Sequence, residues 1–157
     1  MQLYCTEKKV TDHYTTPVLR LLQSAEAIKA RLAGEFSAIH GLSVNEVFLL
    51  MQLERAEQNK LPRVELARRL HMSASTVTRM AAPLEKLGLV TKQADERDAR
   101  LAFVVLTETG KTRIQETRAS FAKQATFLFR DRWLDDEVDQ LSELLGRFVA
   151  DKPGSLT

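Results

Sequence analysis

Apolar residues recur along this chain mostly at the spacing of an α-helix. In residues 11–33 they fall three, four and seven positions apart, which places them along one side of a helix. Residues 1–10 show no such stripe, and we expect them to form a loose leader. Gly34 and Gly41 follow the stripe and are expected to bracket a short connection.

Capping residues mark where further helices begin. Ser43 and Glu46 form a capping box ahead of residues 47–56, where apolar side chains occupy nearly every position. We therefore expect more than one face of that helix to be buried. Near the end of the chain, Thr107 caps a long amphipathic helix and Asp135 is the expected N-cap of a last one.

The centre of the chain changes from short helices to strands. Residues 64–70 form a short apolar-edged helix, and Ser73 caps a second one that ends near Gly88. The β-branched segments 89–93 and 101–106 predict a two-stranded hairpin with a long charged tip. Two short helices, a tight turn and a hairpin make a winged helix-turn-helix, so the fold class is mainly α.

Composition limits what kind of protein this is. The chain has 157 residues, 44% of them hydrophobic and 28% charged, which fits one globular domain over residues 1–157. The single cysteine, Cys5, excludes an internal disulfide and a multi-cysteine zinc site, and it suits a reducing cytoplasm. Neither a signal peptide nor a membrane span is apparent, so we expect a cytoplasmic protein.

Charge is unevenly distributed along the chain. The formal net charge is only +2, but residues 61–113 hold ten Lys and Arg against six Asp and Glu, and the flanks are mildly acidic. A basic centre between acidic arms indicates that the centre meets a polyanion. Random scatter is the alternative explanation for this distribution.

Small polar side chains and one arginine gather where the second short helix begins. A helix that enters the major groove needs hydrogen-bonding groups on its first turn and exposed face. Arginine pairs with guanine, and hydroxyls beside free helix N–H groups hold phosphates. Otherwise the serine merely caps the helix and the rest face water. The candidate DNA contacts are Ser73, Ser75, Thr76, Thr78 and Arg79.

The hairpin tip supplies a second candidate contact. Arg97 and Arg100 lie where a wing reaches the neighbouring minor groove, whose negative potential attracts arginine. Residues 94–100 nevertheless have a net charge of −1, because three acids outnumber the two arginines. Asp95 and Asp98 fit a wing in which carboxylates orient the arginines through charge-assisted pairing. The alternative is a solvated turn.

The central run resembles the DNA-binding core of MarR-type transcriptional regulators. The similarity rests on LARRL, MS, STVTR and LEKLGLV within residues 66–90, on the spacing of the arginines and aspartates at residues 95–100, and on LTETG at 106–110. It implies DNA recognition by the helix after Ser73, minor-groove contact by Arg97, and structural pairing by Asp98 and Arg100.

The resemblance also implies an assembly and a mode of control. The flanking helices, residues 11–33 and 114–150, would form a homodimer interface around a winged-helix DNA-binding region at 43–113. Their apolar stripes have little else to bury against, because the winged helix has inner stripes of its own. Such a dimer would bind a pseudo-palindromic site as a repressor. Many MarR-type proteins release DNA when a small aromatic or phenolic ligand binds between the dimerisation helices and the winged helix.

Two positions depart from the commonest pattern of this family. His71 stands where a glycine usually ends the first helix of the motif, and histidine tolerates the positive φ that such a turn needs. Pro83 lies inside the second helix, where it removes one backbone hydrogen bond and should kink the axis. The kink falls beyond the expected DNA contacts.

Other functions have less support in the sequence. A redox-sensing regulator that uses Cys5 is one alternative, and a winged-helix module that binds protein without DNA is another. The three histidines share no metal-ligand spacing, and no phosphate loop or nucleophile elbow is present. We therefore expect neither an enzyme nor a metal or other cofactor. The ligand-binding residues stay unknown at this point.

Overall fold

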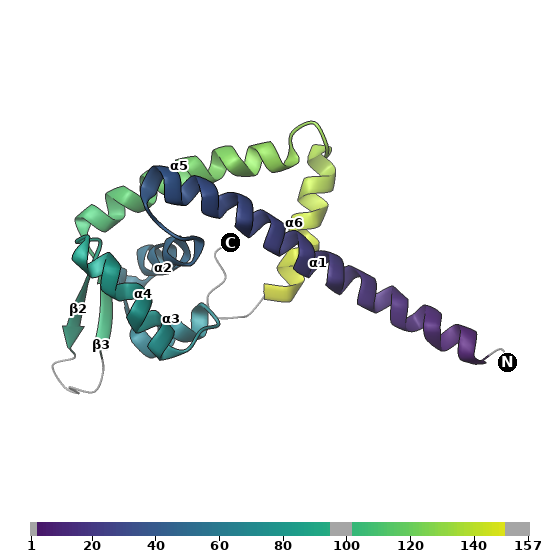
Figure 1. The fold of residues 1–157 in the computed structure, drawn as a ribbon, viewed down its shortest axis with the longest axis horizontal. Helices are drawn as coiled ribbons and strands as arrows, with labels where there is room; N and C mark the ends of the chain where they lie inside the picture. The colour runs from purple at the N-terminus through teal and green to yellow at the C-terminus, as the bar shows by residue number, and fades with distance from the viewer. Residues whose placement is uncertain (1–2, 95–101, 150–157) are drawn as a thin grey trace.

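The computed structural model describes residues 3–94 and 102–149 and is mainly helical (Figure 1). Two long helices, α1 and α5, run past a compact group of short elements, and α6 turns back from the end of α5. In chain order the elements are α1 (Leu3–His40), α2 (Val44–Arg55), the 3₁₀ turn η1 (Glu57–Asn59), β1 (Lys60–Pro62), α3 (Arg63–Arg69), α4 (Ala74–Lys86), β2 (Val90–Ala94), β3 (Ala102–Leu106), α5 (Glu108–Phe129) and α6 (Asp135–Val149).

The first helix is longer than its apolar stripe predicts. Residues 3–10 are helical and not a loose leader, and the helix continues through Gly34 to His40. Only Gly41 ends it, with a left-handed φ of 66°. A glycine inside a helix costs only about 1 kcal/mol relative to alanine, which a 38-residue helix tolerates, so Gly34 breaks nothing.

The sheet has three strands where the sequence predicts a hairpin of two. The order is β1-β3-β2, with both pairings antiparallel. Strand β1 is only three residues long, too short for an alternating pattern to reveal it. Its last residue, Pro62, lies opposite Phe103. Proline is confined to edge strands because it cannot donate a ladder hydrogen bond, and β1 is an edge strand.

The core forms around α2. Leu49, Leu50 and Leu53 are fully enclosed, together with Leu66 of α3 and Leu84 of α4. Seven of the twelve residues of α2 are buried, which confirms that more than one of its faces is covered. Helices α3, α4 and α5 and the strands all pack against α2 or against the core around it. The short elements therefore form one packed unit.

Most of the predicted caps are present. Ser43 and Glu46 form the capping box, with the Ser43 N–H donating to Glu46 Oε2 over 2.7 Å. Thr107 Oγ1 accepts from the Gly110 N–H at 3.0 Å at the start of α5. The prediction for Asp135 is wrong. It is the first residue of α6, and the Leu134 N–H ahead of it donates to Glu137 Oε2.

The turn of the helix-turn-helix motif is built as predicted. His71 has a φ of 53°, in the left-handed region, and so occupies the position of the usual glycine. Gly88, with a φ of 70°, ends the second helix of the motif. Helix α4 continues past Pro83 as far as Lys86.

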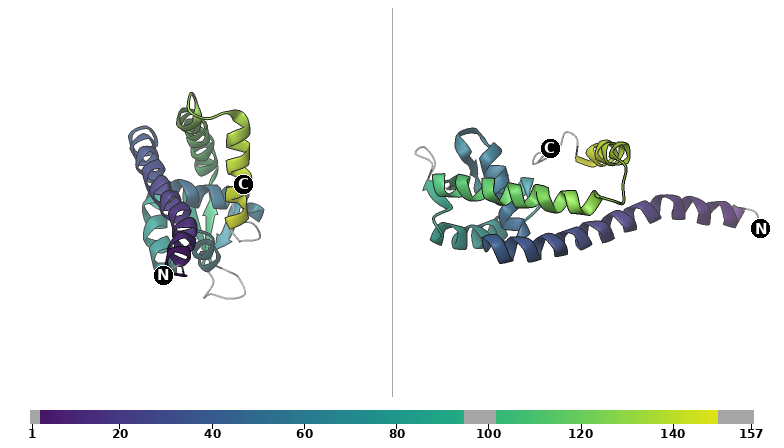
Figure 2. Two further views of the ribbon diagram at one scale, coloured as in Figure 1. Left: turned by 90° about the vertical axis from the view of Figure 1, so that its right-hand side faces the viewer. Right: turned by 90° about the horizontal axis from the view of Figure 1, so that it is seen from above.

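Apolar side chains remain exposed on the outer helices. The N-terminal half of α1 extends away from the rest of the chain (Figures 1 and 2), and α6 buries no residue. Their exposed large apolar residues include Tyr14, Val18, Leu19, Leu22, Leu144, Leu145, Phe148 and Val149. Among the described residues no single helix is long and apolar enough to cross a membrane, and α1 and α2 meet that criterion only as a pair bent by 76°.

Candidate nucleic-acid interface

Helix α4 has a buried side and an exposed polar side. Val77, Ala81 and Leu84 are buried against the core. Ser75 and Arg79 lie on other sides of the helix and are exposed. The helix therefore presents hydrogen-bonding side chains to the exterior from a backbone that its apolar stripe holds in place.

Three hydroxyl groups cluster at the start of α4. Ser73 Oγ accepts from the Thr76 N–H at 3.1 Å, which caps the helix. The same oxygen lies 2.9 Å from Ser75 Oγ and 2.8 Å from Thr76 Oγ1. Ser73 thus caps the helix. Together with Ser75 and Thr76 it also forms a hydroxyl cluster beside the first helix N–H groups, and such an arrangement is suited to binding an anion.

Thr78 and Arg79 differ in whether their side chains have hydrogen-bond partners within the described part of the protein. The Thr78 hydroxyl donates to the Ala74 carbonyl at 3.0 Å and accepts from Arg63 Nη1 at 3.2 Å, and its side chain is partly buried. Arg79 is exposed, and its side chain makes no hydrogen bond or ion pair with another residue of the described ranges. Arg79 is therefore available to an external partner, whereas Thr78 is held within the protein.

The wing is described up to its tip. Strands β2 and β3 pair from Val90 opposite Leu106 to Ala94 opposite Ala102. Lys92 Nζ contacts Glu85 Oε2 at 2.6 Å, which ties the hairpin to α4. The candidate wing residues lie outside the described residues: Asp95, Arg97, Asp98 and Arg100.

An ion-pair cluster fixes the end of α3. Glu65 accepts from Arg68 Nε at 2.9 Å and from Arg69 Nε at 2.7 Å. The hydrogen bond from Arg69, aided by Arg68, holds the pKa of the Glu65 carboxyl below its usual range. Two of the cations in the basic centre, Arg68 and Arg69, therefore share one carboxylate within the protein.

Polar contacts join the winged helix to the long helices. Arg118 of α5 holds Glu54 of α2 through two hydrogen bonds of 2.6 and 2.9 Å. Arg113 Nη1 donates to the His40 carbonyl at 2.9 Å, and His40 Nε2 lies 2.8 Å from Ser120 Oγ. The end of α1, α2 and α5 are thus fixed to one another by charged and polar groups as well as by the core.

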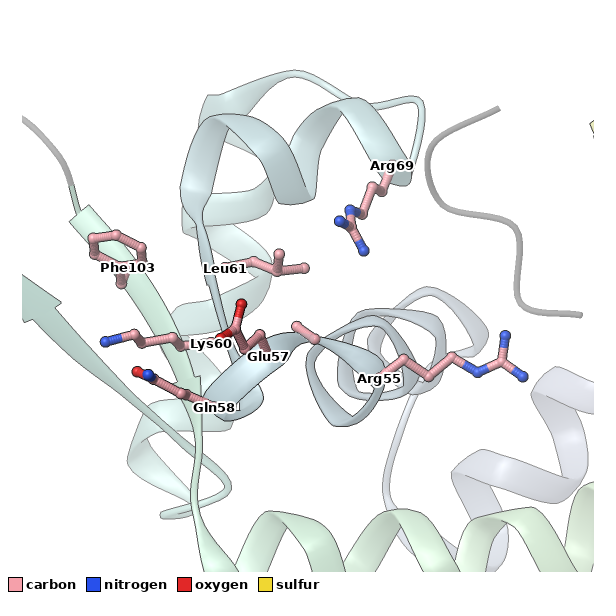
Figure 3. Close-up of a pocket in the computed structure, with 8 residues that line it drawn as sticks. Arg55, Glu57, Gln58, Lys60, Leu61, Arg69 and Phe103 are labelled. Carbon is pink, nitrogen blue, oxygen red and sulfur yellow. The ribbon is translucent and has the colours of Figure 1, made fainter. Parts of the chain in front are cut away.

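A cavity of about 460 Å³ opens at the end of α2 (Figure 3). Lys60, Gln58 and Phe103 lie at one end, and Arg55 and Arg69 lie at the other. Lys60 Nζ stands 5.4 Å from the centre of the Phe103 ring. The lining of the cavity carries three cations and one acid. The hydrophobic pattern does not predict this cavity, because its residues come from α2, η1, β1, α3 and β3 and from Ala56 between α2 and η1.

The wall of this cavity has unusual backbone. Gln58 and Asn59 are consecutive non-glycine residues with φ values of 56° and 54°. The Asn59 side chain donates to the Glu54 carbonyl at 3.0 Å, which supports its conformation. Residues in this region of φ and ψ persist only where the surroundings determine them, and they concentrate at ligand and switch sites.

A second cavity, of about 670 Å³, lies between the end of α5 and the start of α6. Phe129 and Trp133 meet there edge to face, with ring centres 5.8 Å apart. Neither cavity lies between the dimerisation helices and the winged helix, where the family resemblance implies a ligand.

Comparison with known proteins decides the family. Residues 40–101 match the model of the MarR family. YwaE of Bacillus subtilis, an uncharacterized HTH-type transcriptional regulator, is 31% identical over 131 residues, covering 83% of this chain and 74% of that protein. The chain belongs to the MarR family. The HTH-type transcriptional repressor YetL of the same organism is 29% identical over 112 residues, covering 71% of this chain and 66% of YetL.

Solved MarR-family structures share the fold. Sco3205 from Streptomyces coelicolor, crystallised in complex with DNA, has a TM-score of 0.75 at 24% identity, covering 88% of this chain and 91% of that one. A MarR mutant from E. coli, complexed with operator DNA, has a TM-score of 0.73 at 23% identity, covering 88% and 97%. The predicted winged-helix fold and MarR membership are confirmed, and the individual DNA contacts stay predictions.

Proposed function

We propose that this MarR-family chain is a homodimeric, sequence-specific regulator that binds double-stranded DNA and represses transcription. The observation that carries the proposal is the exposed Arg79 beside the hydroxyl cluster of Ser73, Ser75 and Thr76, on a helix whose other side is buried. The DNA-bound state of Sco3205 and the repressor name of YetL support it. Regulators of this kind are not enzymes and act in the cytoplasm.

In this proposal, each group on α4 has a different task. In the major groove, the Arg79 guanidinium pairs with two acceptors of a guanine edge. The hydroxyl cluster at Ser73 holds a backbone phosphate together with the free N–H groups of the first turn. Arg97 and Arg100 contact the flanking minor groove, and Asp95 and Asp98 orient them, as the sequence predicts.

The exposed apolar faces of α1 and α6 form the dimer interface in this proposal. They expose large side chains over both helices, for example Leu22 at 59% and Phe148 at 58% of their full area. A second copy of the chain buries them and places the two α4 helices in successive major grooves, about 34 Å apart. Occupation of a pseudo-palindromic promoter site by such a dimer blocks transcription.

Selection of bound duplexes from a random pool tests the function and the site together. We expect wild type to enrich a palindrome whose half-sites lie about ten base pairs apart. Arg79→Ala should lower affinity for that duplex about tenfold or more and relax preference at one base in each half-site, because a bidentate arginine contact is lost. A wild-type pool without enrichment, and binding insensitive to salt, would instead indicate the protein-binding alternative.

We also propose that a small aromatic ligand releases the DNA, and that the cavity beside Lys60 and Phe103 receives it. Lys60 favours a ligand with a carboxylate, and Phe103 favours a flat ring. Benzoate and phenol share a ring and differ in charge, so calorimetry with both is informative. Benzoate should bind about tenfold more tightly, and Lys60→Gln should abolish the difference while Lys123→Gln keeps it. Equal affinities in wild type would exclude the cavity and leave Cys5-based redox control as the alternative mode of release.

A further inference from the structure

Arg63, the first residue of α3, has a guanidinium group that the protein satisfies only in part. Its Nη1 donates to Thr78 Oγ1 at 3.2 Å, and its Nε is enclosed without any hydrogen-bond acceptor. Within the described ranges no carboxylate pairs with it, and the nearby acid on its own helix, Glu65, is taken by Arg68 and Arg69. Four of its five N–H donors therefore have no partner of their own in the described part of the chain.

The partly satisfied guanidinium group of Arg63 is energetically unfavourable. An enclosed N–H without an acceptor loses its water and gains nothing in return, and the loss is larger for a charged group. The side chain is also long and flexible, so a single neutral hydrogen bond at 3.2 Å compensates poorly for fixing it. The arrangement is expected where an anion from outside binds the Nη donors that have no partner within the described residues.

The contact with Thr78 fixes where that anion must come from. The Thr78 hydroxyl donates its proton to the Ala74 carbonyl and offers a lone pair to Arg63. This holds the guanidinium group of Arg63, the first residue of α3, against α4 at Thr78, the residue before the exposed Arg79. In helix-turn-helix proteins the first helix of the motif crosses the DNA backbone while the second enters the groove.

We propose that Arg63 binds a backbone phosphate of the duplex and that Thr78 positions Arg63 and does not contact a base. Arginine suits this role because its planar fork donates two parallel hydrogen bonds to phosphate oxygens. The inference rests on the proposed DNA-binding function. It changes the expected role of Thr78, whose place beside Arg79 in the sequence pointed to base contact. Nothing in the sequence marked Arg63, since an arginine after a proline at a helix start is an ordinary surface pattern.

Salt dependence of binding tests the phosphate contact. Wild type, Arg63→Gln, Arg63→Lys and the control Arg132→Gln are titrated as full-length chains onto the duplex selected by wild type and onto a scrambled duplex. Each phosphate contact contributes about 0.9 to the slope of log affinity against log salt, so Arg63→Gln should reduce the slope of a dimer by nearly two on both duplexes. Arg63→Lys should keep most of the slope, and Arg132→Gln all of it.

A double-mutant cycle tests the positioning role. Thr78→Val should weaken binding in the wild-type background, about tenfold, and should add little to Arg63→Gln, because both remove the same contact. Base preference in the selection should stay unchanged in every variant. An unchanged salt slope in a folded Arg63→Gln protein would overturn the phosphate contact. Additive losses, with preference altered at one base by Thr78→Val, would overturn the positioning role.

Failure of the proposed function gives a different result. In that case wild type itself enriches no sequence and binds unrelated duplexes equally weakly. The inference about Arg63 fails instead when wild type selects a palindrome and binds it with a steep salt dependence, and Arg63→Gln shows the same salt slope. Circular dichroism and thermal unfolding of each variant confirm that it has folded as wild type does before the titrations are compared.

Discussion

Replacing Leu22 with aspartate is expected to convert the proposed dimer into monomers and to lower affinity for the selected duplex more than a hundredfold. Tyr14, Val18 and Leu22 lie four residues apart on α1 and form an exposed apolar strip on the part of the helix that extends from the body. A carboxylate buried in the centre of an interface without a partner costs several kcal/mol, and a two-fold interface would bury two of them. A monomer then holds only one half-site.

Light scattering coupled to size exclusion measures the mass, and titration onto the duplex measures the affinity. The matched control is Gln23→Asp, which places the same charge one residue further along α1, on a different side of the helix. That variant should remain dimeric and bind nearly as wild type does. If Leu22→Asp stays dimeric at micromolar concentration, the strip on α1 lies outside the interface and another surface must hold the two copies together.

Gly110→Ala is expected to destabilise the fold by about 3 kcal/mol, the upper range for overpacking a core position. A Cβ at Gly110 would collide with the Leu89 carbonyl oxygen and would lie 2.6 Å from Leu106 Cδ1. The Leu89 carbonyl has little room to move, because it accepts from the Thr107 N–H at 3.1 Å and from the Thr107 hydroxyl at 3.0 Å. The glycine of the LTETG run is therefore required by the close packing of the α5 start on the sheet.

Chemical denaturation followed by circular dichroism measures the change, at one fixed protomer concentration because the protein is proposed to be a dimer. The control is Gly34→Ala, where no atom lies within 4 Å of the new Cβ and the residue is inside α1. That substitution should stabilise the protein by up to about 1 kcal/mol through helix propensity. An unfolding midpoint for Gly110→Ala equal to that of wild type would show that the β2–β3 hairpin shifts without cost.

Local chemistry is what made much of the fold predictable. Ser43, Ser73 and Thr107 begin helices because their hydroxyls satisfy N–H groups within three residues, so the signal and the structure lie in the same short segment. His71 follows the same logic, since its turn depends on its own backbone preference. The order of short helices and strands then left few alternatives to a winged helix.

The missed features depend on residues far apart in the chain. Strand β1 exists because residues 60–62 find β3 some forty positions later, and three residues carry no pattern of their own. Arg63 is notable only beside Thr78, fifteen residues on. The Asp135 prediction was wrong because Glu137 satisfies the Leu134 N–H from inside the helix, which leaves no need for an N-cap side chain at Asp135.

Helix α5 is long enough that a small tilt at one end displaces its other end by several ångströms. It is a single helix of 22 residues, about 33 Å long, with the sheet of the wing at its start and α6 at its end. A tilt of about 10° at one end of such a rod moves the other end by about 6 Å, close to two base-pair steps of B-DNA. The contacts of Arg118 with Glu54 and of Arg113 with the His40 carbonyl hold α5 to α2 and to the end of α1. In the proposed dimer, a change in these contacts would therefore change the spacing of the two DNA-binding heads.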